Sequence, residues 1–279
     1  MNILKIVAEV LAAFVIIGTF LPFIRTDHWW IRIFDFPRAQ LLFLGVIVLV
    51  LFILFYQRLV AGERILGILL ISGLIVQCCH IYPYTTIQKL QVKAAKDGRE
   101  PIKIFVANVL QDNTGSLKLL EQIKALDPDI VLLTEMDQRW TNEMRPLEQE
   151  LQHLVLHPLS NTYGMNLYSR FPVIDPEIRK LIDPNIPSIR TELELPSGRS
   201  ILFYGVHPLP PGIKHPHNEK RQDSDQRDAE LVVIAKEVAE EKLPIMIAGD
   251  FNDVAWSHTT RLFQRTSRLL DPRVGRGFF

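Results

Sequence analysis

Residues 245–253 of the sequence read Ile-Met-Ile-Ala-Gly-Asp-Phe-Asn-Asp. The run is apolar up to Ala248 and then turns polar at Asp250 and Asn252, which is typical of a buried strand that ends in a loop. A polar residue often follows a strand simply because the chain leaves the core there. This stretch alone therefore predicts a strand and no particular chemistry.

Three other apolar stretches end in the same way. Residues 102–107 lead to Asn108, residues 130–134 lead to Glu135, and residues 200–206 lead to His207. Neighbouring strands can place their ends side by side, and ligands gather at such sheet edges. Four polar strand ends together therefore favour one shared site.

Amphipathic helical patterns and a hairpin separate these strands. A helix capped by Ser116 is expected after the first strand and a second helix over residues 228–241, while residues 191–195 and 200–206 are expected to form a hairpin. The apolar positions expected to face the sheets are Leu117, Leu120, Ile123 and Leu126 in the first helix and Leu231, Ile234, Ala235 and Val238 in the second. The alternation predicts an α/β or α+β domain, and α+β is the fold class that we expect.

The side chains at the four strand ends suit phosphoryl transfer. Glu135, close to amides and another carboxylate, is a suitable ligand for Mg²⁺, which prefers oxygen. His207 and Asn252 can donate hydrogen bonds to phosphoryl oxygens as charge builds up in the transition state. Asp250 can orient or deprotonate an attacking water.

At these positions the sequence resembles the endonuclease/exonuclease/phosphatase superfamily, which includes DNase I-like nucleases, sphingomyelinases and inositol phosphatases. The resemblance begins near residue 101 and is carried by residues 248–252 (Ala-Gly-Asp-Phe-Asn), by residues 128–135 (Pro-Asp to Glu) and by residues 165–170 (Met-Asn-Leu-Tyr-Ser-Arg). It implies two packed mixed β-sheets flanked by helices.

The resemblance also implies roles for individual residues. Glu135 corresponds to a ligand of Mg²⁺ or Mn²⁺, and Asn108 to a residue that helps hold the metal or its water. His207 and Asn252 correspond to groups that bind the phosphoryl group, and Asp250 to the residue that handles the nucleophile or the transition state.

One family feature is missing from the sequence. The family ends with a strand that supplies an Asp-His pair, whereas no Asp-His dipeptide follows Asn252 here. His258 is a weak candidate to replace that histidine, because it is expected at the start of a helix. We therefore expect a domain that lacks its last strand or strands, through a frameshift, a premature stop or a gene-model error.

The first 83 residues have a different character. Three long apolar runs cover residues 3–24, 39–56 and 65–81, each close to the roughly 20 residues that cross a bilayer as a helix. We expect a membrane anchor at residues 1–83, a linker at 84–100 and the incomplete catalytic domain at 101–279. Bacterial members of the superfamily with three membrane spans before such a domain are known as a type, which implies an integral protein of the bacterial cell membrane.

Composition narrows the partners without choosing a substrate. The chain has 279 residues and no net charge, which weighs mildly against a nuclease, since nucleic-acid binding usually needs a basic face. Counting positive charges in the loops places the domain in the cytoplasm by a small margin. A phosphorylated substrate that is lipid-linked or close to the membrane is favoured over nucleic acid, and the alternatives are a nuclease or a catalytically silent, membrane-tethered binding domain.

Several basic residues leave their roles open. His215 and His217 lie in a proline-rich loop and could bind a metal, although a solvated loop is the simpler explanation. Arg227, with Lys220 and Arg221, could meet an anionic substrate or form a charged face. Arg190 could contact phosphate or point outward from its strand.

Overall fold

The computed structural model describes residues 3–55, 60–94, 101–212, 214–215, 218–221 and 223–277, without the side chains of residues 214–221. The amino-terminal elements are α1 (Ile3–Phe20), η1 (Leu21–Phe23), α2 (Trp29–Arg32), η2 (Ile33–Asp35), α3 (Arg38–Phe55), α4 (Ala61–Ile81) and η3 (Tyr82–Tyr84). The elements that follow are β1 (Ile104–Asn108), α5 (Ser116–Leu126), β2 (Ile130–Thr134), α6 (Gln138–Glu143), η4 (Arg145–Gln149), β3 (His153–His157), β4 (Met165–Ser169), β5 (Val173–Arg179), β6 (Ser188–Glu194), β7 (Ser200–Val206), β8 (Lys214–His215), β9 (Asn218–Arg221), α7 (Asp225–Glu240), β10 (Ile245–Gly249) and α8 (His258–Ser267).

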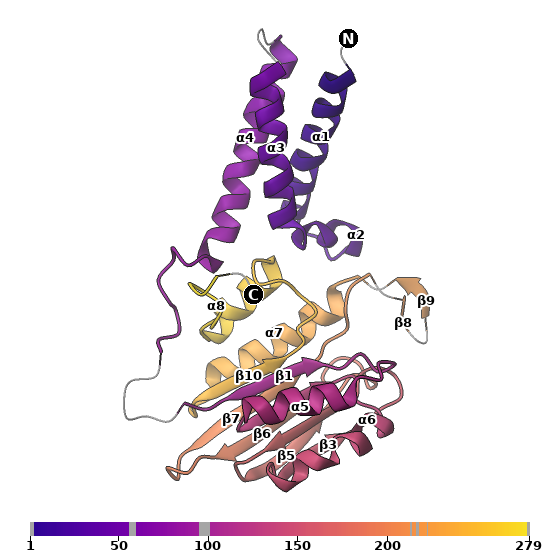
Figure 1. Cartoon of the computed structure of the whole chain (residues 1–279), viewed down its shortest axis with the longest axis vertical. Coiled ribbons are helices and arrows are strands. Elements are labelled where there is room, and N and C mark those ends of the chain that lie inside the picture. The colour runs from indigo at the N-terminus through magenta and orange to yellow at the C-terminus, as the bar shows by residue number, and fades with distance from the viewer. Residues whose placement is uncertain are drawn as a thin grey trace.

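Three amino-terminal helices are long and apolar enough to cross a membrane, which indicates membrane association. They cover Ile3–Phe23, Arg38–Phe55 and Ala61–Tyr84. They pack against one another through small and apolar side chains such as Ala12, Val15 and Val48, while much of their outer surface is exposed apolar side chains. Figure 1 shows the three helices standing as one bundle beside the β-rich part of the chain.

The remaining chain contains two packed mixed sheets. One has the strand order β1-β2-β4-β3 and the other β10-β7-β6-β5. In each sheet one pair is parallel, β1 with β2 and β10 with β7, and the other neighbours are antiparallel. The expected architecture of two mixed sheets flanked by helices is confirmed.

Alternation along the strands builds three apolar layers. On β2, Leu132 faces the space between the sheets, where it meets residues such as Phe203 of β7, whereas Leu133 faces α5 and α6. On β7, Tyr204 faces away from the first sheet and packs with Leu231 of α7 and with α8. Helices therefore cover both outer faces of the sandwich, with α7 and α8 on the side nearer the apolar bundle (Figure 1).

Helix α5 departs from the expected pattern. Its N-cap is Gly115 and makes no side-chain cap, so the prediction of a Ser116 cap is wrong. Leu120 and Ile123 pack on the sheet as expected, whereas Leu117 is 76% exposed and Leu126 is 57% exposed. The residues of this helix that pack in the core are Leu119, Leu120 and Ile123. In α7 all four predicted apolar positions are buried.

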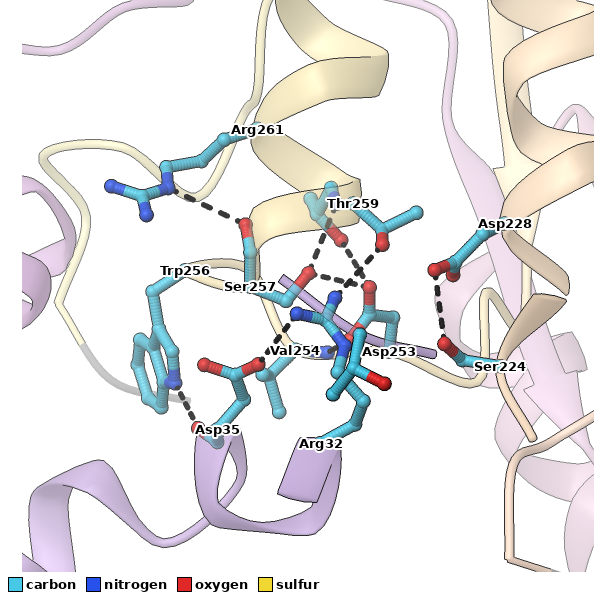
Figure 2. A network of polar contacts seen from close by, with 12 residues as sticks. Arg32, Asp35, Ser224, Asp228, Asp253, Val254, Trp256, Ser257, Thr259 and Arg261 are labelled. Carbon is cyan, nitrogen blue, oxygen red and sulfur yellow. Dashed lines mark hydrogen bonds and ion pairs between the residues drawn. The ribbon is translucent and has the colours of Figure 1, made fainter. Parts of the chain in front are cut away.

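The β-rich part docks on the ends of the apolar helices through hydrogen bonds. The Trp256 indole donates to the Asp35 carbonyl at 2.7 Å, the Tyr84 hydroxyl donates to the Ala255 carbonyl at 2.8 Å, and Arg32 donates to Thr259 at 3.0 Å. Figure 2 shows Arg32 and Asp35 lying against the segment that leads into α8. Backbone groups of the two parts also pair, since the amide of Ser224 donates to the carbonyl of Asp27. The two parts are therefore joined by many bonds in addition to the connecting chain.

Glu230 of α7 yields a prediction about stability. It is 4% exposed, its Oε1 has no hydrogen-bond partner among the described residues, and burial raises the pKa of its carboxyl from 4.5 to about 7, with a smaller contribution from Asp183. When the pKa of a carboxyl is higher in the folded than in the unfolded state, the folded protein loses stability as the pH rises from the unfolded pKa of 4.5 to the folded pKa of about 7. We therefore expect Glu230→Gln to stabilise the protein by about 1–3 kcal/mol at pH 8 and by much less at pH 5.

Thermal unfolding in detergent at the two pH values measures this difference. Glu121→Gln, on the exposed face of α5, is the matched control and should not change the pH dependence. An equal shift of the Glu230→Gln melting temperature at pH 5 and pH 8 would contradict the assignment.

Candidate active site

The predicted site residues lie at the ends of the four strands that form the two parallel pairs. Asn108 is the last residue of β1, and Glu135 directly follows β2. His207 directly follows β7, and Asp250 directly follows β10. In each pair the strands end in register, Asn108 opposite Thr134 and Gly249 opposite Val206. Strand β10 also lies beside β1 and β2 across the sandwich, so all four ends meet at one edge.

Asn108 joins the two sheets at this edge. Its amide nitrogen donates to Glu135 Oε1 at 2.7 Å and to Asp250 Oδ2 at 3.1 Å. Its amide oxygen accepts from the backbone N–H of Leu110 at 2.9 Å, which fixes the side chain. Two carboxylates from different sheets are thus held within hydrogen-bond distance of one atom.

Glu135 occupies an unusual backbone conformation. Its φ is 63°, in the left-handed region that residues with a side chain seldom adopt and that costs about 1–2 kcal/mol. Its second carboxylate oxygen accepts from the backbone N–H of Gln111 at 3.2 Å. The carboxylate of Glu135 accepts from Asn108 in this conformation. A strained backbone at a site residue is typical of functional sites, where the surrounding structure holds the residue in place.

His207 is buried beside the carboxylates. It is 3% exposed, its Nε2 lies 4.0 Å from Asp250 Oδ2, and its ring centroid lies 5.4 Å from that of Tyr163. Burial lowers the pKa of His207, and the negative charges of Asp250 and Glu135 offset this only in part. Its Nδ1 has no hydrogen-bond partner among the described residues. The imidazole is therefore neutral at pH 7 and able to donate one N–H.

Asp250 and Asn252 form a tight turn after β10. Asp250 Oδ1 accepts from the backbone N–H of Asn252 at 2.9 Å, and Asn252 has a φ of 49°. The Asn252 amide nitrogen donates to the carbonyl of Pro208 at 2.8 Å, which leaves its second N–H available. This turn brings the loop after β10 to the loop after β7.

Arg227 supports the site by bonding the backbone of the Asn252 turn, a role that the sequence pattern did not predict. It is 1% exposed, so it forms neither an exposed charged face nor a contact to substrate. Its Nη1 donates to the backbone carbonyl of Asn252 at 2.9 Å and lies 3.5 Å from Asp253 Oδ1, and its Nη2 bonds Asp228 at 2.8 Å. Its position in α7, one turn before the buried Leu231, was the available signal that it faces inward.

Two other basic residues, Arg190 and His258, lie away from the site. Arg190 is held by Glu177, Glu237 and Glu241 on the outer side of the second sheet, so the phosphate-contact alternative is wrong. His258 is the first residue of α8 and lies among Arg32, Arg25 and Arg261, whereas the charges acting on His207 are Asp250 and Glu135. The side chains of His215, His217, Lys220 and Arg221 lie outside the described residues.

The donor atoms at this edge fit a hard divalent cation. Glu135 and Asp250 offer carboxylate oxygens and Asn108 an amide oxygen, and the site is open to water on one side, as Mg²⁺ requires. A separate group of Asp27, His28 and Asp223 lies within 4.8 Å but is exposed. Asp223 there accepts from the Trp29 amide and lies 3.1 Å from the His28 ring nitrogen, so a contact between loops explains it.

Gly249 is a position where the site depends on one residue type. Its φ is 139°, and a Cβ there would lie 1.9 Å from the carbonyl oxygen of Val206. Gly249→Ala should separate β10 from β7, displace Asp250 and His207 together, and destabilise the protein by about 3 kcal/mol or more. Gly198→Ala is the matched control, because φ is 73° there and nothing lies within 4 Å, so only about 1–2 kcal/mol is expected. Equal melting temperatures of the two variants would contradict this account.

Comparisons with known proteins agree with this architecture. Residues 105–279, more than half of the chain, match the endonuclease/exonuclease/phosphatase family. Among curated proteins, none is similar enough in sequence to count as a relative.

Several solved structures are similar to this chain at low identity. Humanized TDP2 from D. rerio is 17% identical with a TM-score of 0.46, over 56% of this chain and 64% of that one. The human nocturnin catalytic domain is 21% identical with a TM-score of 0.48, over 66% and 75%. Sphingomyelinase C from Streptomyces griseocarneus is 14% identical with a TM-score of 0.46, over 61% and 70%. The chain thus spans less than two thirds of the TDP2 chain, and these likenesses do not identify a substrate.

The family match covers both sheets and every residue at the shared edge from Asn108 to Asn252. The chain belongs to the endonuclease/exonuclease/phosphatase family.

Proposed function

We propose that the protein is a Mg²⁺- or Mn²⁺-dependent hydrolase of phosphoester or pyrophosphate bonds. The observation that carries this proposal is the meeting of Asn108, Glu135, His207 and Asp250 at one edge, with Asn108 bonded to both carboxylates. Family membership supports the same reaction class. Glu135 and Asn108 would hold the divalent cation or its water, and the cation would supply Lewis-acid polarisation of the phosphoryl group and stabilise the leaving oxygen.

The roles proposed for the other residues follow from their positions. Asp250 orients or deprotonates the attacking water, since its carboxylate lies at the site and its Oδ1 accepts a hydrogen bond from the backbone N–H of Asn252. His207 is buried and its pKa is lowered, which favours the neutral imidazole. The N–H of this imidazole donates a hydrogen bond to a phosphoryl oxygen. Asn252 donates its free amide N–H to the same group, and Arg227 is a positioning residue that holds the Asn252 backbone.

The substrate we propose is lipid-linked or lies close to a membrane surface. The support is the docking of the β-rich part on the ends of three apolar helices, through Trp256, Tyr84 and Arg32. Such an arrangement keeps the site near headgroups, which a substrate dissolved in the aqueous phase does not require. We also propose that the helices make this an integral protein of a bacterial cell membrane, with the three spans as its anchor.

Single substitutions test the catalytic proposal. Glu135→Ala and Asp250→Ala should each lower turnover of bis-(p-nitrophenyl) phosphate and of a lipid pyrophosphate by at least about 100-fold, because each removes a charged group that acts on the reacting phosphate. The assay uses the full chain in detergent with Mg²⁺ or Mn²⁺, and EDTA should abolish the activity until the metal is restored.

Glu194→Ala is the matched control, because Glu194 is exposed at the end of β6 and pairs with Ser200 at the start of β7, opposite the strand end that leads to His207. Folding of each variant is verified by its melting temperature. If the unaltered chain is folded but its metal-dependent turnover is no higher than that of the Glu135→Ala and Asp250→Ala variants, the enzyme proposal is wrong and a catalytically silent binding domain is favoured. Strongly salt-dependent DNA cleavage would instead favour the nuclease alternative.

A further inference from the structure

A basic cavity lies where the apolar helices meet the β-rich part. Its volume is about 560 Å³, and none of the predicted catalytic residues lines it. The lining comes from the chain after α1, from α2, η2 and the start of α3, from the end of α4, and from α7 and α8. Four arginines contribute: Arg25, Arg32, Arg38 and Arg261.

The floor of the cavity holds two buried arginines that share one carboxylate. Arg32 and Arg38 have side chains that are 6% and 3% exposed. Asp35 pairs with both, at 3.5 Å to Arg32 Nη1 and 2.6 Å to Arg38 Nη2. The Nε atom of each arginine is buried without a hydrogen-bond partner among the described residues. One carboxylate therefore leaves this buried pair with an excess positive charge and two unused donors, which is costly unless an anion is bound.

The rim of the cavity adds Arg25 and Arg261, while Asp27 and Asp228 are the other carboxylates on the lining. Within the described part of the chain no carboxylate forms an ion pair with Arg25 or Arg261. Arg261 instead donates to the Ser257 carbonyl and lies 3.4 Å from His80 Nε2. Asp228, also on the lining, is already bonded by Arg227 and Ser224. Figure 2 shows Arg261 extending from α8 with its bond to Ser257, and Arg32 paired with Asp35.

Two further observations agree with a local excess of positive charge. Burial lowers the pKa of His258, and the charges of Arg32, Arg25 and Arg261 lower it further. Burial likewise lowers the pKa of the Arg261 guanidinium, with Arg38 as the next contribution.

We propose that this cavity binds a phosphate-bearing anion, and that a phospholipid headgroup is its occupant. Guanidinium groups bind phosphate oxygens through charge-assisted hydrogen bonds, and four of them converge here. The exposed apolar side chains beside the cavity fit acyl chains: Phe23, which lines it, is 55% exposed, Ile24 is 53% exposed and Trp30 is 51% exposed. The site lies at the ends of the three apolar helices, at the depth where headgroups are found.

Lipid binding to the full chain in detergent tests the proposal. Phosphatidic acid is compared with diacylglycerol of the same acyl chains, and inorganic phosphate with chloride, in EDTA, by native mass spectrometry and by the shift in melting temperature. The chain should retain one phosphatidic acid and no diacylglycerol. Arg25→Gln with Arg261→Gln should weaken binding by at least about tenfold, since the double variant removes two guanidinium groups that can form charge-assisted bonds to phosphate. Both residues are exposed, so the double variant should fold.

Two controls separate this site from other causes. Arg199→Gln changes an exposed arginine in the β6–β7 turn and should bind like the unaltered chain. Glu135→Gln should also bind normally, because the catalytic site is separate, so failure of the hydrolase proposal leaves this result unchanged. If inorganic phosphate binds and its binding depends on Arg25 and Arg261, but phosphatidic acid is not retained, the site binds free phosphate. That result would overturn the proposal that a phospholipid headgroup is the occupant. Absence of phosphate and phosphatidic acid binding, or equal loss in Arg199→Gln, would overturn the site altogether.

Discussion

The in-register parallel pairing of β10 with β7, and of β1 with β2, is the constraint on which the rest of the site depends. Each parallel pair ends at the same edge, so the residues that follow the two strands are delivered together. The contact of β10 with β1 and β2 across the sandwich then brings the two pairs together. Asn108 completes the junction by bonding one carboxylate from each sheet. Glycine at position 249 is required for this pairing because β10 approaches the Val206 carbonyl too closely for a side chain.

Much of this arrangement could be predicted from the sequence. Buried strands that run into polar residues marked Glu135, His207 and Asp250, and the structure brings all three to one edge. Strands β3 and β5 were missed because polar residues lie within or beside their apolar positions and both are partly exposed, so their apolar pattern is weak. Predicted strand boundaries were correct to within three residues, with the largest difference at the start of β6, where the prediction began at Thr191 and the strand begins at Ser188.

What could not be predicted lies in long-range contacts. The helical spacing of Arg227 to Leu231 indicates that it faces inward, but it does not identify its partner, the Asn252 backbone, 25 positions away along the chain. The ion pairs that hold Arg190 involve glutamates from 13 to 51 positions away along the chain, which no local pattern reports. The division of the chain at residues 83 and 100 and the side of the membrane remain predictions, and so does the expected loss of the last strand or strands.

The joint between the helix ends and the segment from Ala255 to Thr259 has a consequence for how a substrate would be met. Hydrogen bonds from Trp256, Tyr84 and Arg32 act together with backbone pairing, so the catalytic edge cannot swing freely about a linker. Its height above the ends of the helices is therefore fixed. A reactant confined to the same bilayer would search for it by lateral diffusion in two dimensions, at a much higher local concentration than in free solution. A reactant whose scissile bond lies at a different distance from the bilayer than the catalytic edge would gain nothing from that search. The geometry of the joint therefore selects substrates by the distance between their membrane-bound part and the scissile bond.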